Sequence, residues 1–201
     1  HDGDKGEHPA WGTKCFDYGK TGVLHFLLSN LKFWMTEYHF DGFRFDGVTS
    51  MLYHDHGLGT DFNSNDKYFS YNTHVEAITY LQLANELIRQ VNPNAITIAE
   101  DMSGMPGMCL PIEDGGIGFD YRLAMGLPDM WIKAVKQQDE FWDINKMWGD
   151  MCLRRPGEGT VAYVESHDQA LVGDQTMIFR LAGPNMYTDM EKSTHNPVIG
   201  R

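Results

Sequence analysis

The sequence predicts an α/β fold built from parallel βα units, and three observations support this prediction. Short apolar segments typical of strands alternate with helical segments, as in folds where a crossover helix follows each strand. Charged clusters follow these strands at Asp46, 100–101 and 165–168, and parallel sheets place their active sites at that edge. The sequence contains neither GxGxxG nor GxxxxGK[ST], which favours a (β/α)8 barrel over a nucleotide-binding sheet.

The length of the chain predicts part of a barrel. The chain has 201 residues, whereas a complete barrel typically has about 250, and it shows only three clear strands and a weaker fourth. Hydrophobic residues make up 42% and charged residues 22%, as in an ordinary globular chain. We therefore expect a piece of a barrel in preference to a smaller complete sheet.

The first half of the chain reads as loop, helix, strand, loop and helix. Apolar residues at three-and-four spacing predict the first helix, and "FDGFRFDGV" predicts the strand. Thr73 with Glu76 three residues later resembles a capping box at the start of the second helix, which Asn92-Pro93 ends. The expected elements are a loop over 1–20, a helix over 21–38, a strand over 40–48, a loop over 54–72 and a helix over 73–91.

The second half of the chain continues this alternation. "AITIAE" is the clearest strand, and "TVAYVES" is another. Expected here are a strand over 95–100, a Gly-rich loop over 103–118, a weak strand over 119–122, helices around 129–137 and 143–153, a strand over 160–166 and a helix from 169 to about 181.

Composition excludes several classes of partner. The formal net charge of −12 argues against nucleic acid and anionic membranes as partners, and no apolar run reaches the roughly 18 residues of a membrane span. Cys15, Cys109 and Cys152 form no CxxC pair, so we expect a reduced, intracellular chain without a disulfide framework or zinc site. Because the sequence begins at His1, its true start is expected upstream.

Asp46, Glu100 and Asp168 each follow a predicted strand, in separate βα units. Because the carboxyl ends of parallel strands meet at one edge, we expect the fold to bring these acids together. Like charges raise one another's pKa, so such a set needs a chemical reason. Glycoside chemistry supplies one, because one carboxylate attacks the sugar carbon while a second, protonated carboxyl donates to the leaving oxygen.

Arg44 lies two residues before Asp46, so its side chain should project to the same side of the strand. Its positive charge would keep Asp46 ionised for attack, and Glu100, near other acids, is the candidate for a raised pKa. The plainer interpretation is that each acid caps the following helix. Three acids with an arginine shift the balance toward catalysis without removing that alternative.

Histidines occur at two places of interest. His54 and His56 alternate around Asp55, but no third metal ligand lies nearby, so we expect a solvated turn. His167 directly precedes Asp168. Two roles remain open for it, a structural histidine held by hydrogen bonds or a residue that contacts a substrate hydroxyl.

Three segments carry a family resemblance. "DGFRFDGVTSM", "AEDMSGMP" and "YVESHDQALVGD" resemble signature segments of the α-amylase superfamily, in the form found in glycogen and starch branching enzymes. "GFDYRLAM" and "FLLSN" are also similar to branching-enzyme sequence. The resemblance weakens around 137–158 and after Met190, and three segments in order make it specific.

The resemblance implies a retaining double displacement that cuts an α-1,4 link of a glucan and makes an α-1,6 branch at a 6-hydroxyl. Asp46 matches the nucleophile, Glu100 the general acid/base and Asp168 the third acid, which holds sugar hydroxyls. Arg44 matches the arginine beside the nucleophile, and His167 a histidine that contacts the same sugar. No cofactor or metal is implied.

The resemblance also implies what lies around the chain. The family's earliest signature segment, with its histidine and aspartate, is absent and would lie upstream of His1. Residues 1–201 are then part of a single catalytic TIM barrel domain truncated at both ends, roughly strands four to seven. Half a barrel leaves open sheet edges, so we expect these residues alone to be poorly soluble or inactive.

The expected partner is an α-glucan polysaccharide such as glycogen, amylose or starch, and the full-length protein is expected to be a cytoplasmic monomer, or plastidic in a plant. Two alternatives remain open. The same chemistry could pass the sugar to water, as in an α-amylase-like hydrolase. The fold could instead serve a glucan-binding protein without catalysis, although a binder has no evident use for a third acid in its cleft.

Overall fold

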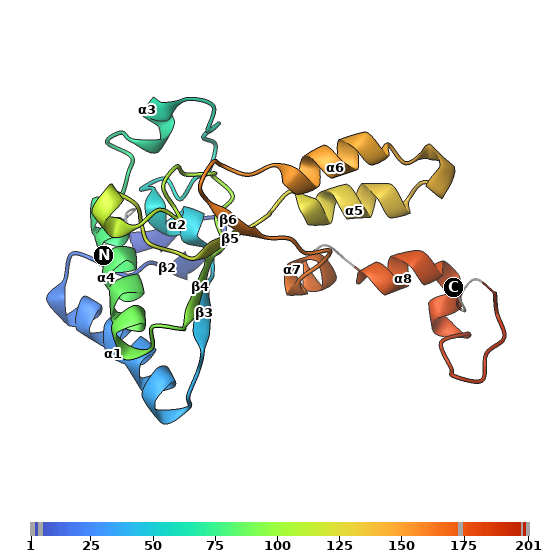
Figure 1. Ribbon diagram of the computed structural model, residues 1–201, viewed down its shortest axis with the longest axis horizontal. Helices are drawn as coiled ribbons and strands as arrows, with labels where there is room; N and C mark the ends of the chain where they lie inside the picture. The colour runs from blue at the N-terminus through green and yellow to red at the C-terminus, as the bar shows by residue number, and fades with distance from the viewer. Residues whose placement is uncertain (1–2, 4–5, 173–174, 198, 200–201) are drawn as a thin grey trace. The chain divides into compact units, whose positions relative to one another are not determined.

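A computed structural model describes residues 3, 6–172, 175–197 and 199 (Figure 1). The chain divides into two compact units. The first comprises His1–Leu123 and Arg154–Val161, and the second comprises Ala124–Leu153 and Ala162–Arg201. Within the described residues, none of the helices combines the length and apolar character needed to cross a membrane.

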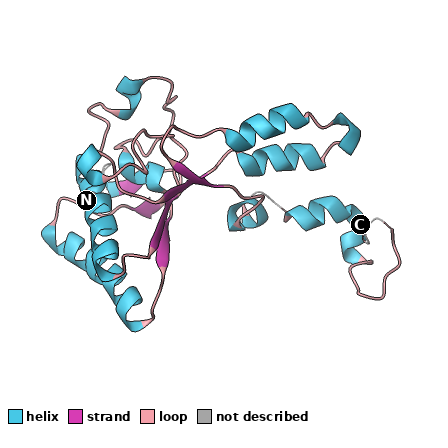
Figure 2. Ribbon diagram, in the orientation of Figure 1, coloured by secondary structure: helices cyan, strands magenta, loops and turns pink. Residues whose placement is uncertain are grey.

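The first unit is built on a four-stranded sheet in which every pairing is parallel. The strands are neighbours in chain order, and Figure 2 shows them gathered together. This α/β arrangement is compatible with part of a barrel, since barrels also pair consecutive strands in parallel. The strands are β3 (Gly42–Phe45), β4 (Ile96–Ala99), β5 (Tyr121–Leu123) and β6 (Gly159–Val161).

Gly42 fixes the start of the first pairing. Gly42 pairs with Ile96, and Phe45 pairs with Ala99. A Cβ atom at position 42 would lie 2.0 Å from the carbonyl oxygen of Ile96, far inside van der Waals contact. Only glycine therefore allows the two strands to approach this closely at this point.

Two 17-residue helices, α1 (Thr21–Glu37) and α4 (Val75–Val91), pack against each other beside the sheet (Figure 1). Leu81, Ala84 and Ile88 of α4 are fully buried, and their spacing places them on one helix face. Burying a side chain such as Leu81 or Ile88 contributes about 1.5–3 kcal/mol. The two long helices predicted from apolar spacing are thus confirmed, and α4 ends at Asn92 as expected.

The capping box predicted at Thr73 is wrong by one residue. His74 is the N-cap of α4, and its Nδ1 accepts a hydrogen bond of 3.1 Å from the amide of Ala77. The hydroxyl of Thr73 instead donates to the carbonyl of Tyr68 at 2.7 Å and accepts from the amide of Ser70. Because that hydroxyl already stabilises the preceding turn, it is not available to cap the helix.

The loops of the first unit contain short elements that the sequence did not predict. The opening loop forms a small antiparallel pair, in which Glu7 pairs with Lys14 both along the backbone and through an ion pair. Short helices also follow β3 and interrupt the loops expected over 54–72 and 103–118. These elements are β1 (Glu7–His8), β2 (Thr13–Lys14), α2 (Val48–Leu52), α3 (Asn65–Tyr68) and η2 (Ile112–Asp114).

The second unit is helical. Its first two α-helices pack together. Trp142, two residues before the second of them, makes an edge contact with Trp131 of the first and donates a 2.9 Å hydrogen bond from Nε1 to the carbonyl of Ala134. The described elements are α5 (Leu127–Val135), η3 (Asp139–Phe141), α6 (Ile144–Cys152), α7 (His167–Leu171), α8 (Met177–Ala182) and η4 (Gly183–Tyr187).

Two predictions near the end of the chain need correction. The strand expected over 160–166 ends at Val161, because its partner β5 ends at Leu123 and the pairing of those two residues is the last in the register. The single helix expected over 169–181 is divided into α7 and α8, with Thr176 accepting the Phe179 amide as a new N-cap. Residues 173 and 174 of that expected helix lie outside the described part of the chain.

Candidate active site

Asp46 and Glu100 follow adjoining strands at the same edge of the sheet. Phe45 at the end of β3 pairs with Ala99 at the end of β4, so the next residues along each strand are the two acids. The Glu100 amide donates to the Phe45 carbonyl at 3.0 Å, which extends the ladder up to the site. The expectation that the fold would bring these two acids together is therefore confirmed.

Arg44 bridges the two carboxylates. Its Nη1 lies 2.8 Å from Oδ1 of Asp46, and its Nη2 donates to Oε2 of Glu100 at 2.8 Å. The side chain thus projects to the side of the strand that its spacing from Asp46 predicts. One guanidinium therefore holds both acids in a fixed relation through charge-assisted contacts.

The two acids have different environments. The side chain of Asp46 is 77% exposed, whereas that of Glu100 is 14% exposed. Burial and a hydrogen bond with Asp46 raise the pKa of Glu100, together with the negative charge of Asp46, while the Gly47 amide and Arg44 act in the opposite direction. The net shift is upward, so Glu100 holds its proton to a higher pH than an ordinary glutamate.

The turn after Asp46 supports Glu100 directly. Gly47 adopts a left-handed conformation with φ of 58°, which glycine reaches without steric cost. Its amide donates to Oε2 of Glu100 at 2.9 Å, and the amide of Val48 donates to the Glu100 carbonyl at 2.9 Å. Helix α2 begins at this point, so the turn that starts this helix also orients the Glu100 carboxylate.

A buried ion triad lies beside the acids, and the sequence did not reveal it. Arg122 of β5 contacts Asp101 through Nη2 and Glu158 through Nη1, the latter at 3.0 Å. All three residues are buried. Arg122 also donates to the carbonyl of Met105 at 3.0 Å, so the triad joins the ends of β4 and β5 to the start of β6. An arginine in the apolar segment "GFDYRLAM" was the one available signal.

Asp101 connects this triad to the loop that carries the candidate nucleophile. Its carboxylate accepts from the hydroxyl of Thr49 in α2 at 2.7 Å. It also accepts from the amides of Ser103, Gly104 and Met105. Asp101, which follows Glu100, is therefore hydrogen-bonded to helix α2, which follows Asp46.

The third acid, Asp168, lies in the second unit at the first turn of α7. Its Oδ1 is 3.4 Å from Nε2 of His167, and both side chains are partly exposed. Ser166 and Gln169 form the capping box of this helix, so Ser166 rather than Asp168 supplies the cap. That Asp168 and His167 meet Asp46 and Glu100 around one sugar stays a prediction.

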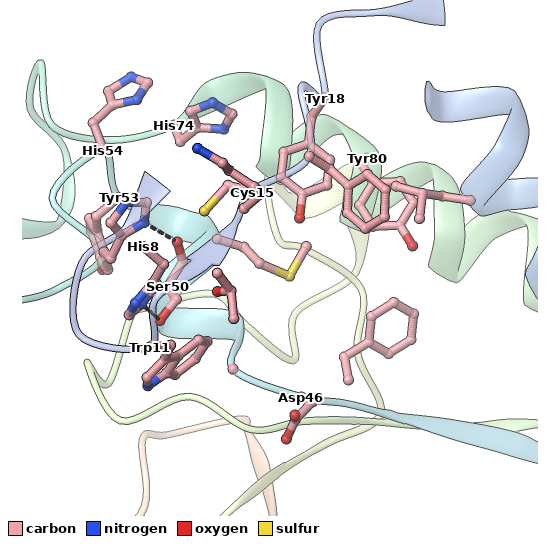
Figure 3. A pocket seen from close by; sticks show the side chains of 18 residues that line it. His8, Trp11, Cys15, Tyr18, Asp46, Ser50, Tyr53, His54, His74 and Tyr80 are labelled. Atoms are coloured by element: carbon pink, nitrogen blue, oxygen red, sulfur yellow. Dashed lines mark hydrogen bonds between the residues drawn. The ribbon is translucent and has the colours of Figure 1, made fainter. Parts of the chain in front are cut away.

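A pocket of about 300 Å³ opens beside Asp46 (Figure 3). Aromatic and imidazole side chains from the opening hairpin, from α2 and its following turn, and from α4 form its walls. Those labelled in the figure are His8, Trp11, Cys15, Tyr18, Asp46, Ser50, Tyr53, His54, His74 and Tyr80.

The histidines of this pocket correct the expectation of a solvated turn. His56 is buried, with Nδ1 3.0 Å from the Ser50 carbonyl and Nε2 3.0 Å from the Glu7 carbonyl. Burial, and secondarily the neighbouring His56, lower the pKa of His8. Over the described ranges, no group of three or more His, Cys, Asp or Glu side chains is arranged to hold a metal ion.

Several curated proteins similar to this chain carry the name of a branching enzyme. The chain is 55% identical to "1,4-alpha-glucan-branching enzyme" of Yarrowia lipolytica and 52% identical to that of Felis catus. It is 50% identical to "1,4-alpha-glucan-branching enzyme, chloroplastic/amyloplastic" of Oryza sativa subsp. japonica. Each alignment covers 100% of this chain but 31%, 29% and 25% of the respective relative, so the chain spans less than a third of their length. No family model matches the chain.

Proposed function

From the relationship of this chain to the 1,4-alpha-glucan-branching enzymes over its whole length, we propose that the protein cleaves an α-1,4-glucosidic bond and transfers the released glucan chain to a 6-hydroxyl, making an α-1,6 branch. The observation that carries the proposal is the Arg44 bridge between an exposed and a buried carboxylate at adjoining strand ends. Glycoside chemistry requires two carboxyl groups in different environments, one that stays ionised as the nucleophile and one that stays protonated as the acid.

In the first step, the carboxylate of Asp46 attacks the anomeric carbon and forms a covalent glycosyl ester. The protonated carboxyl of Glu100 gives its proton to the departing glucan oxygen, so the bond breaks without releasing an alkoxide. Exposure suits Asp46 for attack, and the raised pKa of Glu100 suits it for proton donation.

In the second step, Glu100 changes from acid to base. Once Asp46 is esterified it carries no negative charge, so two of the causes that raise the pKa of Glu100 disappear. Arg44 and the Gly47 amide remain, and both favour the carboxylate form. Glu100 then removes the proton from the 6-hydroxyl of the acceptor as that oxygen attacks the anomeric carbon. The ester bond to Asp46 breaks in the same step, so that the Asp46 carboxylate is regenerated and Glu100 is protonated again.

The remaining roles extend the proposal to the second unit. Asp168 would hold sugar hydroxyls and stabilise the distorted transition state, with His167 contacting the same sugar. The four strands would correspond to strands four to seven of a (β/α)8 barrel, and residues 1–201 to part of a single catalytic domain. The whole protein would be a monomer without nucleic-acid partners, acting in the cytoplasm, or in the plastid of a plant.

The Asp46→Asn variant tests the proposal, with amylose as substrate. Branching lowers the iodine colour of amylose without a proportional rise in reducing ends. The unsubstituted protein should behave in this way, and Asp46→Asn should lose turnover while keeping its glucan affinity, because the amide keeps the shape but not the nucleophile. Turnover within tenfold of the unsubstituted protein would remove Asp46 from this role.

The same assay separates the two alternatives. A rise in reducing ends that matches the number of bonds cut would indicate transfer to water, and hence a hydrolase. Glucan binding without any turnover in the full-length protein would indicate a binding protein. The different environments of Asp46 and Glu100 favour catalysis over either mere binding or helix capping.

A further inference from the structure

Trp11 presents an exposed indole in the same pocket as Asp46. The residue is 60% exposed, although large aromatic side chains are usually covered. It comes from the turn between β1 and β2, and both Trp11 and Asp46 line the pocket beside α2 (Figure 3). An exposed ring next to the attacking carboxylate is in a position to contact the substrate.

The indole is held rigidly. Its ring stacks on the imidazole of His8 with a centroid separation of 3.9 Å and an interplanar angle of 11°. His8 is itself buried, and its Nε2 lies 2.9 Å from the hydroxyl of Ser50 in α2. Because one face of the indole is covered by His8, the exposed area belongs to the opposite face and the edges. A preorganised ring loses little freedom when a ligand stacks on it.

Trp11 also lies directly over the turn that follows Asp46. A Cβ atom added to Gly47 would meet Cη2 of the indole at 2.8 Å. The absence of a side chain at position 47 therefore lets the indole approach the backbone beside the candidate nucleophile. A ligand on the free indole surface would adjoin the site of attack.

The character of the pocket indicates a neutral, ring-shaped ligand. Apart from its histidines, the described residues of the lining include only two with a formal charge, Lys14 and Asp46. Its volume of about 300 Å³ is at the small end of the range for ligand pockets, about 300–1,000 Å³. A sugar combines an apolar face, which suits an aromatic ring, with hydroxyls that suit imidazole and hydroxyl partners.

We propose that Trp11 is a stacking platform for a glucosyl unit of the α-glucan, next to the unit that Asp46 attacks. This inference rests on the proposed function, since it names where that substrate binds. It assigns Trp11 to substrate binding, and not to the proton transfers carried by Glu100.

The test measures binding of maltoheptaose by calorimetry in the Asp46→Asn background, where turnover does not interfere. Trp11→Leu keeps an apolar side chain against His8 and Gly47 but removes the aromatic face, whereas Trp11→Phe keeps a ring. Stacking energies of this kind correspond to about tenfold in affinity, so we expect Trp11→Leu to weaken binding about tenfold and Trp11→Phe less than threefold. Trp148→Ala, at a tryptophan of similar 67% exposure in α6, should leave affinity unchanged.

A second readout separates binding from mere support of the turn. In the enzyme with Asp46 intact, Trp11→Leu should raise KM while the basic limb of the pH profile stays in place. Unchanged affinity, an effect equal to that of Trp148→Ala, or a shifted basic limb with unchanged KM would overturn the inference. Absence of branching in the full-length unsubstituted protein would instead refute the proposed function, so the two failures are distinguishable.

Discussion

The Arg122→Met substitution should destabilise the protein strongly, because Arg122 joins two buried carboxylates. Removing one partner of a buried ion pair costs about 3–5 kcal/mol. Loss of contact with both Asp101 and Glu158 argues for the upper part of this range. Asp101 keeps the hydroxyl and amide donors around it, and Glu158 keeps the amide of Gly107 at 2.8 Å, which argues for the lower part. We therefore expect a loss of about 4 kcal/mol, a large share of the 5–15 kcal/mol, roughly, that stabilises a typical protein.

The assay is urea-induced unfolding followed by tryptophan fluorescence, with the free energy compared at equal slope. Arg89→Met is the matched control, because Arg89 is a partly exposed arginine 3.4 Å from Asp120, and exposed pairs contribute about 0–1 kcal/mol. The double variant Arg122→Met with Glu158→Gln should recover part of the lost free energy of unfolding, because it has one uncompensated buried charge fewer than Arg122→Met alone. Equal losses in Arg122→Met and Arg89→Met would refute this account of the triad.

Three further predictions follow from the structure. Glu100→Gln should abolish most turnover and flatten the basic limb of the pH profile of kcat/KM. The reason is that the raised pKa of Glu100 sets the pH above which its proton is lost. If the variant keeps a basic limb with the same midpoint, that limb belongs to another group. His74→Ala should lower the unfolding free energy by about 1 kcal/mol through loss of the α4 cap, whereas Glu76→Ala should change it by less than about 0.5 kcal/mol. A larger loss in Glu76→Ala than in His74→Ala would instead support the capping box predicted for Thr73 and Glu76. Residues 1–201 expressed alone should be poorly soluble or inactive in the iodine assay. Within the described residues, the outer strands β3 and β6 each present an open edge. Measurable branching by that segment would contradict this expectation.

Apolar patterning and the rule for strand ends were sufficient to predict the main elements and the proximity of two of the three candidate acids. The two long helices have a continuous apolar face, which local sequence records directly. The meeting of Asp46 and Glu100, and the placing of Arg44 beside Asp46, required only the alternation of side chains and parallel pairing. The contact of Arg44 with Glu100 was not predicted. These features depend on neighbours in sequence or on a general property of parallel sheets.

The features that escaped prediction depend on distant partners. His56 is buried with its two ring nitrogens 3.0 Å from the carbonyls of Ser50 and Glu7, and nothing around position 56 indicates the Glu7 contact. The Arg122 triad likewise joins residues 21 and 36 positions apart. Helix α2, with five residues, is too short to show a helical period. In each case tertiary contacts decide the outcome, and a pattern read along the chain contains no record of them.

The bare backbone at Gly42 has a consequence for how sequence changes in this protein should be interpreted. Any side chain there would force β3 away from β4 or slide it along, and a slip of one residue would turn Asp46 to the opposite face of the sheet. The alignment of Asp46 with Glu100 is thus decided partly at the far end of the strand, by a residue that touches neither of them. A mutation at Gly42 would therefore look like a catalytic defect in an activity screen, although Asp46, Glu100 and Arg44 are all still present.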